Sequence, residues 1–219
     1  MGTFSATANS SSTIGYAQYG SSSWSTGSSS GACQGAYQGT TAAKSRVGVM
    51  VFNGAGVALK GKLIQSITLT ITSSGAGSGS SSKKLTFHKA NYQSLNTSVR
   101  GSAQVGDTLG TLTGKFYSNT VTHTLNTSTN AALFSAMKAY FEAGNSALVL
   151  YNGETSSSSG YSSNYARVTS CTVTVTYIDA VVWYCDGGTW KRCTVWYRLG
   201  GAWKQVVPYY NSGGAWVRV

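Results

Sequence analysis

The ionisable residues that general acid–base catalysis would need are few in this chain. The two histidines are His88 and His123. The five carboxylic acids among 219 residues are Asp107, Glu142, Glu154, Asp179 and Asp186. A glycosidase needs two carboxylates flanking the scissile bond, and no two of these acids stand together in a recognisable motif. The sequence also has no GxSxG nucleophile motif and no phosphate-binding glycine loop. We therefore expect a protein that is not an enzyme and has no catalytic residues.

The cysteines do not predict a metal site. Cys33, Cys171, Cys185 and Cys193 contain no CxxC pair, and two histidines are too few to complete a zinc site convincingly. Cys185 and Cys193 flank a Gly-Gly turn, but a two-residue turn would place Cys185 opposite Trp190 and Cys193 opposite Val182. These positions lie on opposite faces of the ribbon, which argues against a disulfide within the hairpin. We expect no metal and no cofactor.

The stronger signal is an aromatic repeat in the last 40 residues. Three Gly-Gly pairs recur every 13 residues, at 187–188, 200–201 and 213–214, and each is followed by a tryptophan and preceded by an aromatic pair. Paired glycines allow the positive φ that a two-residue hairpin turn requires at both central positions. The pattern predicts three short hairpins. Their candidate contact residues are Trp183, Tyr184, Trp190, Trp196, Tyr197, Trp203, Tyr209, Tyr210 and Trp216.

Three interpretations of these aromatic side chains stay open. Trp and Tyr combine a broad apolar face with a polar group, which suits contact with another subunit or with a glycan. The rings could instead pack against one another and against the rest of the protein. With two-residue turns, Arg198 lies opposite Trp203 and Arg218 opposite Tyr209, an arrangement suited to cation–π packing.

The elements that must carry this repeat are mostly strands. Residues 46–52, 64–72 and 171–177 alternate apolar and polar side chains, as half-buried strands do. One amphipathic helix is predicted at about 129–143, where Leu133, Phe134, Met137, Tyr140 and Phe141 form an apolar stripe. We expect one or two strands within residues 1–45, long loops around 21–32, and a loop at 155–164.

These elements indicate an all-β protein, a jelly-roll-like antiparallel β-sandwich with one helix. The sandwich is expected to span residues 1–178 as one domain. Residues 179–219 would form a second, small module of three aromatic hairpins, which cannot bury its own aromatic residues well.

The number and distribution of basic residues limit which kinds of partner we expect. The net charge is +11, but the 16 basic residues are scattered rather than clustered as in a nucleic-acid footprint. We expect only weak attraction to anionic polymers and no nucleic-acid partner. No segment reads as a signal peptide or a membrane span. The chain is therefore expected to be made in the cytoplasm and to have no membrane partner.

Particular segments resemble known proteins. "RVGVMVF" (46–52), "LKGKLIQSITLTIT" (59–72), "YFEAGNSALVLYNGE" (140–154) and "SNYARVTSCTVTVTYI" (163–178) resemble the DNRLRE-like or carbohydrate-binding-module-like jelly-roll class of wall proteins and phage tail proteins. The resemblance covers roughly residues 5–178. The final "GGAWKQVVPYYNSGGAWVRV" (200–219) is similar to C-terminal segments of structural proteins from phages of Gram-positive gut bacteria.

The resemblance implies a non-enzymatic phage virion protein from a tail fibre, a tail tip or a head decoration. Its partners would be other virion subunits, most simply further copies of itself, and host cell-surface glycans if it contributes to attachment. The alternative is a carbohydrate-binding module of a secreted or surface bacterial protein.

Overall fold

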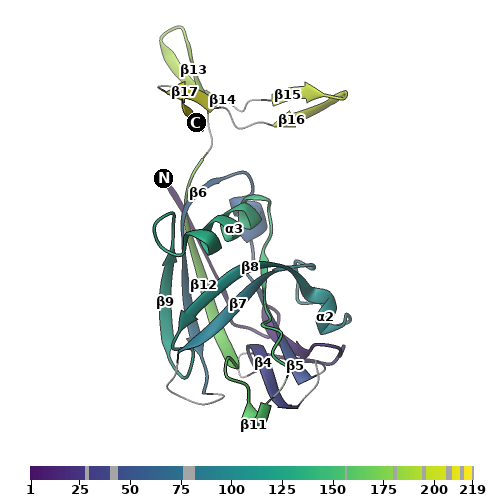
Figure 1. The fold of residues 1–219 in the computed structure, drawn as a ribbon. Helices are drawn as coiled ribbons and strands as arrows, with labels where there is room; N and C mark the ends of the chain where they lie inside the picture. The colour runs from purple at the N-terminus through teal and green to yellow at the C-terminus, as the bar shows by residue number, and fades with distance from the viewer. Residues whose placement is uncertain are drawn as a thin grey trace.

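The structure is a computed structural model. It describes residues 1–27, 30–39, 44–75, 82–155, 157–179, 182–193, 196–205, 209–212 and 215–218. Most of the described chain forms an antiparallel β-sandwich with a helix packed against it, and three small hairpins follow (Figure 1). The predicted all-β, jelly-roll-like sandwich is confirmed.

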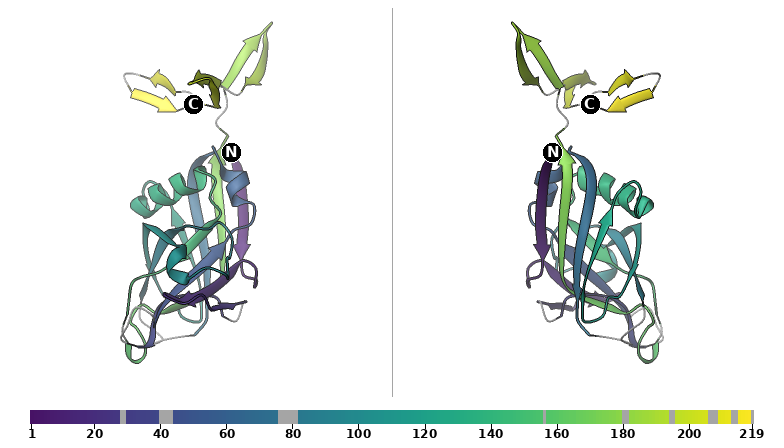
Figure 2. Two further views of the ribbon diagram at one scale, coloured as in Figure 1. Left: turned by 90° about the vertical axis from the view of Figure 1, so that its right-hand side faces the viewer. Right: turned by 90° about the vertical axis from the view of Figure 1, so that its left-hand side faces the viewer.

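The first layer of the sandwich is a four-stranded antiparallel sheet. Its strands, in spatial order, are β1 (Gly2–Ala8), β12 (Ala166–Ile178), β6 (Leu63–Ser73) and β9 (Thr120–Leu125). The right-hand view of Figure 2 shows these four strands side by side, facing the viewer.

The second layer has six strands. In spatial order they are β3 (Trp24–Thr26), β2 (Ile14–Gln18), β5 (Ser45–Val51), β10 (Ala147–Leu150), β7 (Lys83–Ala90) and β8 (Val105–Gly114). Strand β8 therefore forms an edge of this layer.

One strand connects the two layers. β4 (Ala32–Gly39) pairs with β12 through Ala32–Gln34 and with β5 through Gly35 and Ala36. β11 (Ser157–Tyr161) adds to the outer part of β4. The twelve strands thus form one continuous hydrogen-bonded sheet folded onto itself.

Alternation along β6 explains how the first layer is built. Ile67, Leu69 and Ile71 are buried, as predicted, and the threonines between them lie on the other face. That outer face carries Ser and Thr on all four strands, and their hydroxyls bond across strands, as in the Thr70–Thr122 pair at 3.2 Å. Cross-strand Thr pairs of this kind stabilise a sheet modestly without needing charge.

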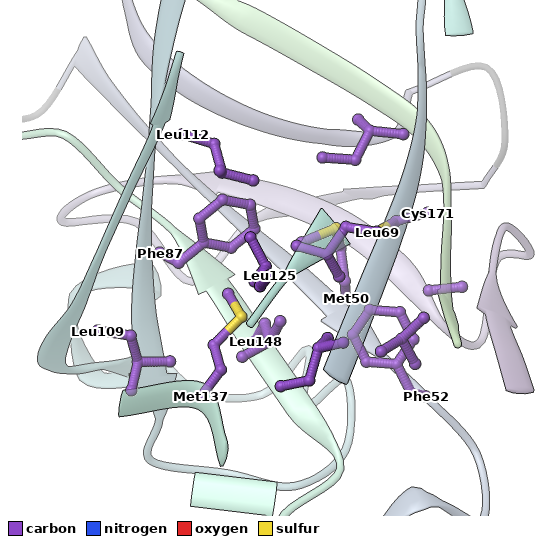
Figure 3. Close-up of a cluster of buried hydrophobic side chains, with 14 of the residues drawn as sticks. Met50, Phe52, Leu69, Phe87, Leu109, Leu112, Leu125, Met137, Leu148 and Cys171 are labelled. Carbon is purple, nitrogen blue, oxygen red and sulfur yellow. The ribbon is translucent and has the colours of Figure 1, made fainter. Parts of the chain in front are cut away.

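The core lies between the layers and under the helix. β5 is buried on both faces, because Met50 enters the main core while Val47 and Val49 pack in a second cluster on the other side. Figure 3 shows Met50 and Phe52 with residues from β6, β7, β8, β9, β10 and the helix in one apolar cluster. Burial of this apolar surface is the main driving force for the fold.

The predicted helix is present as α3 (Ala131–Glu142), and its five predicted apolar residues are all buried. Gly144 adopts φ +94°, the left-handed conformation common just after a helix. Two further short helices, α1 (Ala55–Leu59) and α2 (Gly101–Gln104), were not predicted. At five and four residues they are too short to show helical periodicity.

The expectations for the loops were partly wrong. The described part of residues 1–45 holds four complete strands rather than one or two, and β3 lies within the expected 21–32 loop. β11 likewise lies within the expected 155–164 loop. The segments that contain β3 and β11 are rich in Ser and Gly and have no apolar pattern. They form strands because neighbouring strands supply hydrogen-bond partners.

The three predicted hairpins are present. They are β13 (Val182–Asp186) with β14 (Thr189–Cys193), β15 (Trp196–Leu199) with β16 (Ala202–Gln205), and β17 (Tyr209–Ser212) with β18 (Ala215–Arg218). Each forms its own two-stranded sheet. Gly187, Gly188, Gly200 and Gly201 all have positive φ, as a two-residue turn requires. The third pair, 213–214, lies outside the described residues.

Candidate functional site

The hairpin register agrees with the sequence expectation. Arg198 lies opposite Trp203, and Tyr209 lies opposite Arg218. In the first hairpin Cys185 lies opposite Trp190, and Cys193 lies opposite Val182. The register positions of the two cysteines therefore lie on opposite faces of that ribbon, as expected from a two-residue turn.

The register also places aromatic residues opposite basic ones repeatedly. Trp183 is paired with Arg192, and Tyr184 with Lys191. In the second hairpin Tyr197 is paired with Lys204. Because strand residues alternate between faces, the register positions of Trp196, Arg198 and Trp203 share one face. Because the sequence repeats every 13 residues, corresponding positions fall on corresponding faces of the three hairpins.

Trp196 is the member of the predicted aromatic set whose side chain the structure describes, and it is 53% exposed. Such exposure is high for a tryptophan, which usually buries most of its ring. Its neighbour Arg198 donates from Nε to the carbonyl oxygen of Gly201 at 3.4 Å. The backbones of all nine predicted residues lie in β13–β18, and the side chains of the other eight lie outside the described part of the structure.

The carboxylates are bound to separate partners. Asp107 pairs with Lys89 at 2.8 Å, and Asp179 pairs with Lys62. Glu142 pairs with Lys138 on α3 and accepts the backbone N–H of Ile64 at 2.8 Å. Among the described residues, no group of three or more His, Cys, Asp or Glu could hold a metal ion. The side chain of Asp186 lies outside the described residues.

Glu154 is the most heavily hydrogen-bonded of these acids. Its carboxylate accepts the Ser162 and Ser163 hydroxyls, the Asn152 side-chain amide, and both the side-chain amide and backbone N–H of Asn164. Burial raises the pKa of Glu154, but these donors together hold the pKa below its ordinary value. The network binds the segment after β10 to the segment before β12.

Both histidines are engaged within the sandwich. The ring nitrogens of His88 lie 2.9 Å from the Gly106 carbonyl oxygen and 2.8 Å from that of Tyr151. His123 packs against Phe116, and burial lowers its pKa. Burial also raises the pKa of the free Cys171 thiol to about 12. The Nε2 atom of His123 is buried and has no hydrogen-bond partner among the described residues.

A groove that sequence reasoning missed lies between α3 and the adjoining parts of β7 and β8. This open groove has a volume of about 800 Å³. The apolar lining includes Ala136 and Ala139 on α3, Ala143 directly after the helix, and Leu109 on β8. The polar lining includes Lys89, Asn91, Asp107, Thr108 and Asn145. Alanines at 136, 139 and 143, spaced as on one helix face, were the available signal, but alanine also has the highest intrinsic helix propensity.

An irregular stretch of β8 shapes this groove. The pairing register with β7 shifts between Phe87 and His88 and again between His88 and Ala90. Such bulges bend a strand and re-aim its side chains. A Cβ on Gly106 would lie 2.9 Å from Asn91 Oδ1, so only glycine fits without a shift of its neighbours. His88 holds the bulge through the Gly106 carbonyl.

The side-chain amides of two asparagines at the groove are oriented by hydrogen bonds from their Nδ2 atoms to backbone carbonyl oxygens. Asn91 donates from Nδ2 to the carbonyl oxygens of Ala103 and Val105, at 3.0 and 3.1 Å. Asn145 donates from Nδ2 to the Tyr140 carbonyl at 2.8 Å. The Oδ1 atom of each side chain accepts no hydrogen bond from the residues that the structure describes. Both oxygens are therefore available to a donor from outside.

The described part of the chain contains no helix long and apolar enough to cross a membrane. No known protein-family model matches the sequence, and no curated protein matches it.

Proposed function

We propose that this chain is a non-enzymatic structural protein of a bacteriophage virion, from a tail fibre, a tail tip or a head decoration. The sandwich would be a rigid body, and the hairpin repeat would make the contacts between subunits. The proposal rests on the resemblance of residues 200–219 to C-terminal segments of phage structural proteins and on the form that the 13-residue repeat takes in the structure.

The observation that carries the subunit role is the isolation of each hairpin as a two-stranded sheet. A lone hairpin in water is marginally stable, and it gains stability by packing against another surface. Repeated aromatic residues opposite basic ones make that packing specific, because aromatic and Arg side chains are enriched in protein interfaces. The exposed ring of Trp196 fits a residue that is buried on assembly.

Light scattering tests the subunit role. We expect the full chain to be a multimer and a chain ending at Ile178 to be a monomer. Trp203→Ala in the full chain should lower the mass or weaken the assembly. Val57→Ala is the matched control, since Val57 is 89% exposed on the sandwich and its removal should not change the mass. A monomeric full chain at high concentration would contradict the proposal.

The second candidate function is glycan binding by the hairpins, as in a carbohydrate-binding module of a bacterial surface protein. The exposed ring of Trp196 favours it, because an indole face can stack on a sugar ring. Sedimentation with purified Gram-positive cell walls tests it. Binding by a monomeric full chain that is lost with Trp196→Ala would favour this function over subunit assembly.

A further inference from the structure

We propose that the groove between α3 and β8 is a binding site for a short neutral oligosaccharide. This site is separate from the hairpins and does not depend on the assembly role proposed for them. Its volume of about 800 Å³ falls within the range of roughly 300–1,000 Å³ found for small-molecule sites.

The charges at the groove select an uncharged ligand. Lys89 and Asp107 are its charged lining residues, and they pair with each other at 2.8 Å. Their formal charges cancel, so the groove offers a polyanion no local excess of positive charge although the chain as a whole carries +11. A ligand carrying one charge would have to break this pair or leave its own charge unmatched.

The polar groups available in the groove are mostly hydrogen-bond acceptors, so they favour a ligand rich in donors. Asn91 and Asn145 each keep Oδ1 available while Nδ2 is fixed to a backbone carbonyl. The Asp107 carboxylate can accept beyond its bond to Lys89, and Thr108 adds a hydroxyl that lies 3.4 Å from His88 Nδ1. Sugar hydroxyls are donors that match such acceptors. Because the amides are already oriented, binding costs less side-chain entropy.

The floor of the groove suits the other face of a sugar ring. Ala139 on α3 and Ala143 directly after the helix are exposed, and Ala136 and Leu109 complete an apolar surface. A pyranose presents C–H groups on one face and hydroxyls around its edge. It can therefore cover the methyl groups while its hydroxyls reach the polar lining, which is the combination of apolar and precisely placed polar groups usual in ligand sites.

A peptide strand fits this groove less well. β8 is an edge strand, so a peptide could add to it by backbone pairing. That mode requires a regular edge, and the two register shifts in β8 interrupt it. The Gly106 carbonyl is also occupied by His88. These features favour a compact ligand over an added strand.

The test uses ¹⁵N-labelled full-length protein titrated with maltotriose, cellotriose, mannotriose and N,N′,N″-triacetylchitotriose. We expect at least one of them to shift the amide signals of residues at 106–109 and 139–145 in a saturable way. Ala139→Trp should fill the groove and weaken that binding by about tenfold or more, equivalent to about 1.4 kcal/mol. Ser135→Trp is the matched control on the same helix, because Ser135 is exposed and does not line the groove.

The outcomes separate this site from the hairpins. Binding that survives Ala139→Trp but is lost with Trp196→Ala would overturn the groove assignment in favour of the hairpins. Saturable shifts at the groove from a polyanion such as heparin, but from none of the four sugars, would overturn the neutral ligand class. No shift with any of the four at millimolar concentration would overturn the proposal. None of these results changes the mass measured by light scattering, which tests the assembly role by itself.

Discussion

The side chain of Gln34 in β4 takes the place of a neighbouring strand beside Lys84 in β7. Its Nε2 donates to the Lys84 carbonyl oxygen at 2.7 Å, and its Oε1 accepts the Thr86 backbone N–H at 2.9 Å. β10 pairs with β7 only from Phe87 to Lys89, so these backbone groups would otherwise lack a partner on that edge. One buried amide thereby continues the ladder and joins the two layers.

This arrangement makes Gln34 important for stability. Gln34→Ala would leave the Lys84 carbonyl, the Thr86 N–H and the Asn164 carbonyl without that partner. We expect the free energy of unfolding to fall by about 2–4 kcal/mol, measured by denaturant titration. Gln65→Ala is the control, since Gln65 is exposed and its side chain donates locally to the Leu63 carbonyl. An equal, small change in both variants would show that the Gln34 contacts matter little.

The crossing of β4 over β5 depends on Gly48. A Cβ at this position would lie 2.6 Å from the Cys33 backbone nitrogen and 2.8 Å from the Ala32 carbonyl carbon. Because backbone atoms cannot move aside cheaply, Gly48→Ala should lower the thermal midpoint by several degrees, as overpacking costs about 1–3 kcal/mol.

Gly20→Ala provides the matched comparison for Gly48→Ala. A Cβ on Gly20 meets nothing within 4 Å, and its backbone is not left-handed. It should be neutral, or stabilising by up to about 1 kcal/mol through the unfolded chain. Similar melting temperatures for the two variants would contradict the close approach of β4 and β5.

The second hairpin depends on the conformation of Gly201. Its φ is +83°, and a Cβ added there would meet no atom within 4 Å, so only backbone conformation restricts the position. A β-branched residue there is strongly disfavoured. Gly201→Val should shift or broaden the amide signals of residues 196–205 while leaving those of the sandwich unchanged. Leu199→Val in the same hairpin should keep it folded, and loss of the hairpin in both variants alike would point to a cause other than the turn.

We expect the stability of the fold to depend on pH through the carboxylate of Glu154. Its pKa in the folded state lies below the ordinary value of 4.5, although burial alone would raise it, because hydrogen bonds favour the charged form. The stability it contributes is therefore complete above pH 4.5 and is lost as the pH falls through the folded-state pKa. Denaturant titrations from pH 7 to pH 3 should show Glu154→Gln less stable than the wild type at pH 7, with the difference shrinking at low pH.

Asp107→Asn is the control for the acid titration. The pKa of Asp107 is also lowered, by the hydrogen bond and charge of Lys89, but its side chain is 82% exposed. Solvent screens such pairs, so the variant should change stability little at any pH. A Glu154→Gln difference that stays constant across the pH range would rule out the titration of Glu154 as its cause.

The sequence by itself determined the sandwich class, the helix and the hairpins. Alternation in β6, the stripe on α3 and the 13-residue glycine spacing are local patterns, and each follows directly from strand, helix or turn geometry. The hairpin register, including Arg198 opposite Trp203, also followed from the two-residue turn alone.

Tertiary structure decided the rest. β3 and β11 exist because other strands complete their hydrogen bonds, and their Ser- and Gly-rich sequences carry no apolar pattern to reveal them. The groove forms where α3 packs beside the bulge in β8. The hydrogen-bond partners of Gln34 are distant in sequence, and those of Glu154 are positioned by loops. Such contacts depend on which segments meet in space, and periodicity within one segment holds no information about its neighbours.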